Sequence, residues 1–139
     1  ILIFRFSNIF DVDIINRNTF LGLMHQNYFN KKRINFDISL NSLRDFVSMK
    51  SIKKVLRKIE INQASGIYNI GSQNGYTIEQ IIKFYFGSKA IKSIPIKDTK
   101  IVKSQTLSIK KIRNLLRIKK SEFHNETKIQ LLKCKKFFF

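Results

Sequence analysis

The chain has 139 residues, 43% of them hydrophobic and 12% aromatic, which is enough for one domain with a core and too little for two. The formal net charge is +18, from 27 Lys and Arg against 9 Asp and Glu, and the single cysteine, Cys134, excludes an intrachain disulfide. The apolar opening, Ile1–Phe4, is far shorter than the roughly 20 residues that span a bilayer, so we expect a cytoplasmic protein with no membrane partner.

The first half of the chain contains strand and helix patterns in alternation. Ile1–Phe6 is a short run of β-branched and aromatic residues and predicts a buried strand. Asn16–Tyr28 has a helical apolar face, and Arg33–Ile38 alternates with the period of a half-buried strand. A polar loop is expected over Ser39–Asp45, followed by a helix over Ser48–Glu60.

The second half repeats this alternation. Ile67–Ile70 predicts a strand that leads into a glycine-containing turn. Thr77 and Gln80 then have the spacing of a capping box, which predicts that a helix begins there. The remaining expected elements are a strand near Ile91–Ile96, a helix over Ile109–Leu116 and a last helix through Ile129 and Leu132. Strands alternating with helices predict an α/β fold.

Three segments resemble, in order and spacing, the second half of the extended short-chain dehydrogenase/reductases. The segments are Arg5–Phe10, similar to R-x-x-N-x-(Y/F)-G, Leu43–Val47, similar to R-D-F-(V/I), and Gly66–Ser72, similar to G-x-Y-N-(I/L)-G-(S/T). Leu107–Leu116 is similar to the tail of related enzymes. These are NAD(P)-dependent epimerases, dehydratases and reductases of nucleotide-diphosphate sugars, a class associated with polysaccharide biosynthesis.

The resemblance implies a partial Rossmann-type α/β fold, made of the last core strand and a small mixed α/β substrate-binding region. Residues 1–120 would form that C-terminal region, and residues 121–139 a basic C-terminal helix and tail. Because the chain begins at Ile1 inside an apolar stretch, we expect the N-terminal, NAD(P)-binding half to be missing. The expected partners are therefore a nucleotide-diphosphate sugar and that missing half.

The resemblance also implies a set of substrate-binding residues: Asn8, Thr19, Phe20, Ile34, Phe36 and Arg44. Arg44 would hold the substrate phosphates, because a guanidinium matches phosphate oxygens bidentately. Asn8, at the exit of a strand, would donate to the same diphosphate, and Asp45 would orient the loop or cap the next helix. Taken without the resemblance, Arg44 and Asp45 read as a surface ion pair and Asn8 as a turn former.

The helix that begins at Asn18-Thr19-Phe20 would border the sugar nucleotide with its backbone. Ile34 to Phe36 would flank the base through main-chain hydrogen bonds. The chain departs from the family at Asp11, where a glycine is usual, and at Ser48–Ser51, where the family has V-x-D.

The family's catalytic and cofactor motifs are absent from this sequence. It contains no glycine-rich βα turn of the kind that meets an NAD or NADP pyrophosphate. The pairs Tyr28/Lys32 and Tyr85/Lys89 have the catalytic Tyr-x-x-x-Lys spacing, but both follow the first motif, whereas the family's pair precedes it. We therefore expect no catalytic residue and no cofactor bound by this chain alone, with NAD or NADP held by the complete parent.

Two other interpretations remain open. The charge alone would suit a basic module for nucleic acid or an acidic polymer, but the lysines are spread along the chain without a nucleic-acid motif, which disfavours that partner. The other is a decayed, truncated gene product. His25 and His124 lack companion ligands, so no metal site is expected, and Cys134, among lysines, is expected at the surface.

Overall fold

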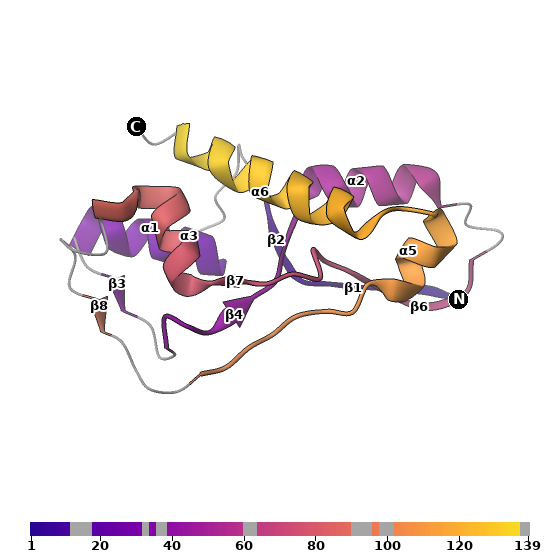
Figure 1. Ribbon diagram of the computed structural model, residues 1–139, viewed down its shortest axis with the longest axis horizontal. Coiled ribbons are helices and arrows are strands. Elements are labelled where there is room, and N and C mark those ends of the chain that lie inside the picture. Colours follow the sequence, from indigo (N-terminus) through magenta and orange to yellow (C-terminus); the bar gives the residue numbers. More distant parts are fainter. Residues whose placement is uncertain are drawn as a thin grey trace.

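The computed structural model describes residues 1–11, 18–31, 34–35, 39–59, 64–89, 96–97 and 102–136. Within these ranges strands and helices alternate, which confirms the predicted α/β fold (Figure 1). The strands are β1 (Leu2–Phe6), β2 (Asn8–Phe10), β3 (Ile34–Asn35), β4 (Leu43–Arg44), β5 (Phe46–Ser48), β6 (Gly66–Ile70), β7 (Tyr76–Thr77) and β8 (Ile96–Lys97). The helices are α1 (Phe20–Lys31), α2 (Met49–Lys58), α3 (Ile78–Phe86), α5 (Lys110–Leu116) and α6 (Lys120–Lys136).

Most strand pairs are parallel and join segments far apart in the sequence. β1 pairs with β6 over five residues, with Phe4 opposite Tyr68, and β2 pairs with β5. The β3–β8 pair is also parallel, whereas β4 and β7 pair antiparallel. A parallel pair requires a crossover connection, and here α1 and α2 lie in the chain between β1 and β6.

Side-chain caps fix where the helices begin. The predicted capping box is confirmed: Thr77 Oγ1 accepts from Gln80 N at 3.1 Å, and Gln80 Oε1 accepts from Thr77 N at 2.9 Å. Ser48 caps α2 by accepting from Ser51 N at 3.1 Å. Each cap satisfies an amide that the first turn of a helix leaves without an intrahelical acceptor.

Two apolar clusters form the core, and α6 contributes to both. The first cluster gathers residues of α1, α3 and α6 around Phe46. The second lies between the β1–β6 sheet and helices α2 and α5 and includes Tyr68, Val55 and Ile112. From α6, Leu131 joins the first cluster and Phe123 the second. The expected boundary between residues 120 and 121 stays a prediction.

Several boundaries differ from the sequence-based expectations. The first helix begins at Phe20, and the expected residues Asn16 and Arg17 lie outside the described part. β4 lies inside the expected loop, while β2 and β5 were not predicted at all. These strands have two or three residues each, too few to show an apolar period, and their position depends on distant partners. Cys134, expected at the surface, is buried against the first cluster.

No helix in the described ranges is both long and apolar enough to cross a membrane.

Candidate functional site

A cleft of about 560 Å³ opens where the chain leaves β1. One wall is the segment that follows β1, and the other is an extended segment before α5, with Asp45 between them. The lining residues are Phe6, Ser7, Asn8, Asp45, Ser104, Gln105, Thr106 and Leu107. Ligands in open α/β sheets bind beyond the carboxyl ends of the strands, and this cleft lies at that end of β1.

The extended wall, residues 103–107, is held against β4 by its backbone. Gln105 N donates to Leu43 O at 3.0 Å, and Asp45 N donates to Gln105 O at 3.0 Å. These bonds form a parallel bridge between Arg44 and Gln105. Ser104 Oγ adds a further bond by accepting from Leu43 N at 3.3 Å, and the side chains of Ser104 and Gln105 are exposed along the cleft.

The carboxylate of Asp45 is buried and joins three segments. Its Oδ1 accepts from Ser72 N at 2.8 Å and from Ser72 Oγ at 2.6 Å, while Oδ2 accepts from Leu107 N at 3.1 Å. The residue is 1% exposed. The suggestion that Asp45 caps the following helix is wrong, because Ser48 does so. Asp45 instead orders the loop after β6 and one wall of the cleft.

Asn8 is hydrogen-bonded to the backbone carbonyl of Asp45. Asn8 Nδ2 donates to Asp45 O at 2.8 Å, and Asn8 N donates to that oxygen at 3.1 Å. The side-chain amide therefore fixes the two walls relative to each other. Its other N–H and its carbonyl oxygen remain as polar groups on a residue that lines the cleft.

Arg44 borders the cleft without lining it. Its Nη1 donates to Lys103 O at 3.0 Å, beside the wall residue Ser104, and the side chain is half-buried. A guanidinium has five N–H donors, of which this bond uses one. No ion pair with Asp45 is found in the described part of the chain, which contradicts the surface-pair interpretation.

Two other predicted binding residues, Thr19 and Phe20, lie at the beginning of α1. Thr19 caps α1, with Oγ1 accepting from Gly22 N at 3.2 Å, and Phe20 packs on Phe46 with ring centroids 5.9 Å apart. Ile34 pairs with Ile96 between β3 and β8. Phe36 lies outside the described residues. The structure thus brings Asn8 and Arg44 together around Asp45. Thr19 and Phe20 are not among the residues that line the cleft.

Sequence reasoning missed the residues of the extended wall and Ser7. Residues 103–107 read as a polar segment without periodicity, so nothing in them indicated a wall of a site. Ser7 lies inside the first family-like motif, and its Oγ is buried with no hydrogen-bond partner among the described residues. A buried hydroxyl normally has a partner, so this atom marks a place where a polar group of a ligand or a water fits.

The only described turn that resembles a cofactor loop is filled by the protein itself. Gly71 and Gly75 lie between β6 and the β7–α3 unit, but the Ser72 amide and hydroxyl are bound to Asp45. A Cβ built at Gly71 would lie 2.5 Å from Asp45 Oδ2, so that carboxylate occupies the space where a phosphate would approach. This turn therefore does not fit an NAD(P) pyrophosphate.

Tyr85 and Tyr76 are unsuited to proton exchange near neutral pH. Tyr85 is buried in the first core cluster, and burial raises its pKa. Burial, followed by the negative charge of Asp45, raises the pKa of Tyr76 to about 12. The described ranges contain no group of three or more His, Cys, Asp or Glu side chains arranged to hold a metal ion.

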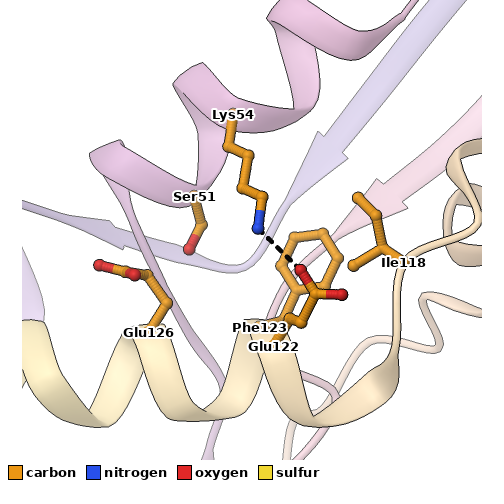
Figure 2. Close-up of a pocket in the computed structure, with 6 residues that line it drawn as sticks. All are labelled: Ser51, Lys54, Ile118, Glu122, Phe123 and Glu126. Atoms are coloured by element: carbon orange, nitrogen blue, oxygen red, sulfur yellow. Dashed lines mark hydrogen bonds and ion pairs between the residues drawn. The ribbon is translucent and has the colours of Figure 1, made fainter.

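A second, much smaller hollow lies between α2 and α6 (Figure 2). Its volume is about 20 Å³, which is room for about one water molecule. The lining residues are Ser51, Lys54, Ile118, Glu122, Phe123 and Glu126. Lys54 and Glu122 already form an ion pair at 2.7 Å, so this hollow is part of a helix–helix contact and not a candidate ligand site.

No protein-family model and no curated protein matches the chain. Solved structures do match it. The UDP-N-acetylglucosamine 4-epimerase from Methanobrevibacter ruminantium, in complex with UDP-N-acetylmuramic acid, is 18% identical with a TM-score of 0.73, over 99% of this chain and 45% of that one. The dTDP-glucose 4,6-dehydratase from Bacillus anthracis, in complex with NAD, is 18% identical with a TM-score of 0.70, over 99% and 44%.

The UDP-glucuronic acid 4-epimerase from Bacillus cereus, in complex with UDP-glucuronic acid and NAD, is 15% identical with a TM-score of 0.66, over 98% of this chain and 45% of that one. The likeness at these identities shows the fold: part of the Rossmann-like fold of epimerases and dehydratases, as the sequence motifs implied. The chain spans a little under half the length of the solved proteins that it matches.

Proposed function

We propose that this chain is the nucleotide-diphosphate sugar-binding portion of an NAD(P)-dependent epimerase, dehydratase or reductase. The observation that carries the proposal is the junction at Asp45, where Asn8 and Arg44 meet beside a cleft large enough for part of a nucleotide sugar. Solved proteins with the same fold hold UDP-glucuronic acid or UDP-N-acetylmuramic acid, which supports the substrate class.

The chemistry of the cleft suits such a ligand. A diphosphate requires cationic and N–H donors, which Arg44 and the Asn8 amide supply, and sugar hydroxyls suit the polar side chains of Ser104 and Gln105. Thr19, Phe20, Ile34 and Phe36 belong to the proposal as further binding residues. The same ligand would offer acceptor oxygens to the buried Ser7 hydroxyl.

Catalysis in this proposal needs a second, NAD(P)-binding half. The chain's own β6–α3 turn is filled by Asp45, and burial raises the pKa of both Tyr76 and Tyr85. When bound by that half, NAD(P) would supply hydride transfer. This chain's residues would bind the nucleotide sugar and orient its sugar toward the cofactor.

Calorimetric titration with UDP-, dTDP- and GDP-sugars tests the binding proposal. At least one should bind the purified chain, and Arg44→Ala should weaken it by about 10- to 100-fold, because a charge-assisted hydrogen bond contributes roughly 1.5–3 kcal/mol. Arg57→Ala is the matched control, since Arg57 is an exposed arginine on α2 and does not line the cleft.

Equal effects of the two substitutions would contradict the proposal. Binding that falls steeply with salt, is indifferent to Arg44→Ala, and is stronger for mixed-sequence RNA than for any nucleotide sugar would instead support the basic-module interpretation.

A further inference from the structure

His124 lies where α6 packs against a strand next to the candidate site. Its imidazole stacks on the ring of Tyr76 in β7, with the ring centroids 5.3 Å apart and the ring planes at 15° to each other. Tyr76 Oη lies 3.3 Å from His124 Nδ1 and 3.4 Å from the His124 backbone oxygen, to which it can donate. Because Tyr76 is 4% exposed and His124 is half-buried, this contact is part of the packing of α6 on β7.

Tyr76 connects this contact to the centre of the site. In the antiparallel β4–β7 pair, Arg44 lies directly opposite Tyr76. Asp45 follows Arg44 in the chain, and its carboxylate orders one wall of the cleft. α6 also contacts the next residue, since Thr127 Oγ1 donates to Phe46 O at 3.5 Å. The segment from Arg44 to Phe46 is therefore attached to α6 at two points, one of them through Tyr76.

A positive charge on His124 would oppose this packing. Burial lowers the pKa of His124, and the charges of Lys128 and Lys120 on the same helix lower it further. The face of a tyrosine ring attracts a cation, but burial and the two lysines outweigh that attraction. The Tyr76 phenol stays neutral, because burial and then the charge of Asp45 raise its pKa to about 12. Acid therefore adds an unfavourable charge to the contact.

The acidic side chains of the helices around His124 are engaged with lysines. The helices packed against α6 are α2 and α3. The described ion pairs on these three helices are Lys50–Glu126, Lys54–Glu122 and Lys83–Glu79. These carboxylates therefore offset lysine charges and do not stabilise a charged His124.

We propose that His124 is a pH-sensitive link between α6 and the candidate site, and that its protonation weakens the binding of an anionic ligand there. With neutral His124, α6 packs on β7 and keeps Tyr76 opposite Arg44. With charged His124 this packing loosens, and Arg44 loses the ordered strand that holds it at the edge of the cleft. The ligand in this inference rests on the proposed function, whereas the link between α6 and β4 does not.

The direction of the effect follows from the lowered pKa of His124. Its neutral form contributes full stability above the ordinary pKa of 6.5, and this contribution is lost as the pH falls through the lowered value. The pKa values of Glu122 and Glu126 lie below 4.5, so both stay charged between pH 7.5 and pH 5.5. In this range the response of His124 is therefore separate from that of the carboxylates.

An NMR titration of the purified chain from pH 8 to pH 5 tests the link without ligand. The backbone amide signals of Arg44 and Tyr76 should shift with the same midpoint as the His124 imidazole, and His124→Gln should abolish this step. His25→Gln is the matched control and should keep it, because His25, also half-buried with a pKa lowered by burial, stacks on Phe29 within α1. A step that is absent in wild type or persists in His124→Gln would overturn the proposal.

Lys128→Gln gives a second test that does not alter the contact itself. Lys128 is exposed, and its charge lowers the pKa of His124, so its removal should move the His124 midpoint to higher pH. The Arg44 amide midpoint should move by the same amount. An Arg44 midpoint that stays in place while that of His124 moves would show that the two are not linked.

Calorimetric titration with a UDP-sugar at pH 7.5 and pH 5.5 tests the effect on binding. The affinity of wild type and of His25→Gln should fall by about fivefold or more between the two pH values, and that of His124→Gln should fall clearly less. Equal falls in all three proteins would overturn the regulatory role. If no nucleotide sugar binds at either pH, the proposed function fails, and the NMR titration still decides whether His124 is linked to Arg44.

Discussion

Asp45 and Gly71 form a tight pair that fixes the loop after β6. The Asp45 carboxylate accepts from Ser72 and Leu107, and Gly71 leaves the space that these bonds need, because a Cβ there would meet both Asp45 Oδ2 and Ser7 Oγ. An acidic residue beside a proposed phosphate site would normally repel the ligand. Here the N–H and O–H donors around the carboxylate offset its charge, so its role is to position the walls.

Asp45→Ala should lower the free energy of unfolding by about 3 kcal/mol, because it removes a buried carboxylate that accepts from the Ser72 amide, the Ser72 hydroxyl and the half-buried Leu107 amide. Urea denaturation followed by circular dichroism measures this loss. Glu79→Ala is the control, since the Glu79 side chain forms an exposed ion pair with Lys83 within α3. This substitution should lower the free energy of unfolding by only about 0.5 kcal/mol.

A double-mutant cycle between Asp45→Ala and Ser72→Ala should show a coupling of about 1 kcal/mol or more, since the two side chains share one hydrogen bond. If the two losses of stability add, the hydrogen bond between the Asp45 and Ser72 side chains does not contribute to stability. The claim that Asp45 fixes the loop after β6 through this bond would then be wrong.

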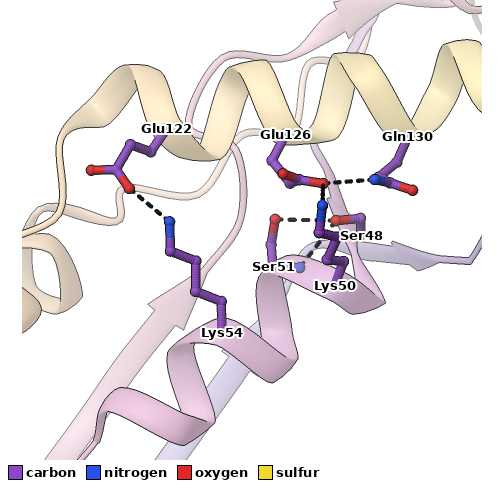
Figure 3. A network of polar contacts seen from close by, with 7 residues as sticks. All are labelled: Ser48, Lys50, Ser51, Lys54, Glu122, Glu126 and Gln130. Atoms are coloured by element: carbon purple, nitrogen blue, oxygen red, sulfur yellow. Dashed lines mark hydrogen bonds and ion pairs between the residues drawn. The ribbon is translucent and has the colours of Figure 1, made fainter.

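At the scale of elements, α2 and α6 are joined by a small polar network (Figure 3). Lys54 pairs with Glu122 at 2.7 Å and Lys50 with Glu126 at 3.1 Å, while Gln130 Nε2 donates to Glu126 at 2.6 Å. Glu122 and Glu126 lie one turn apart on α6, which lets both reach the same face of α2. The network therefore fixes how α6 lies against α2 along the helix axes.

This network predicts a loss of stability in acid. The hydrogen bond from Lys54, followed by that from the Lys119 backbone, lowers the pKa of Glu122. Burial opposes ionisation of Glu126, but hydrogen bonds from Gln130 and Lys50 outweigh it and lower that pKa as well. Both carboxylates thus stabilise the fold above their ordinary pKa of 4.5, and this contribution is lost as the pH falls through the lowered values.

Thermal unfolding from pH 6 to pH 3 measures the effect. Lys54→Ala should reduce the acid-dependent loss by less than about 1 kcal/mol, because the pair is exposed to solvent. Lys53→Ala is the control and should leave the acid-dependent loss of stability unchanged. Lys53 is the adjacent exposed lysine, and the described residues show no ion pair for it. If wild type and Lys54→Ala lose the same stability in acid, the Lys54–Glu122 pair does not contribute to the acid dependence, and this prediction is wrong.

The elements that could be predicted are those whose signals are local. The capping box at Thr77 fixed the beginning of α3, and helical apolar spacing located α2 and α5. β2, β4 and β5 could not be predicted, because two or three residues carry no period and their partners lie far away in the chain. For the candidate site, motif spacing predicted Asn8 and Arg44 as binding residues, and their binding role stays a prediction. The extended wall around Gln105 carries no signal except its backbone pairing with β4, which exists only in the folded chain.

At the scale of the whole molecule, the charge of +18 is far from balanced by ion pairs. The described part of the chain contains three, between Lys50 and Glu126, Lys54 and Glu122, and Lys83 and Glu79. Helix α2 alone carries five Lys and Arg in ten residues and no acid. Mutual repulsion of these cations should therefore outweigh the attraction within the few pairs.

Raising the salt concentration should consequently stabilise this protein. Between about 0.05 and 0.5 M salt the Debye length falls from about 14 to 4 Å, which screens repulsion between surface cations several residues apart. A gain of roughly 1 kcal/mol would raise Tm by about 3–5 °C for a chain of this size. Differential scanning calorimetry in sodium chloride measures this rise. Reversing two exposed cations, as in Lys53→Glu with Arg57→Glu, should make it smaller because the repulsion is already relieved. A Tm that falls with salt would contradict this prediction, because it would show that the attraction within the ion pairs outweighs the repulsion between the other cations.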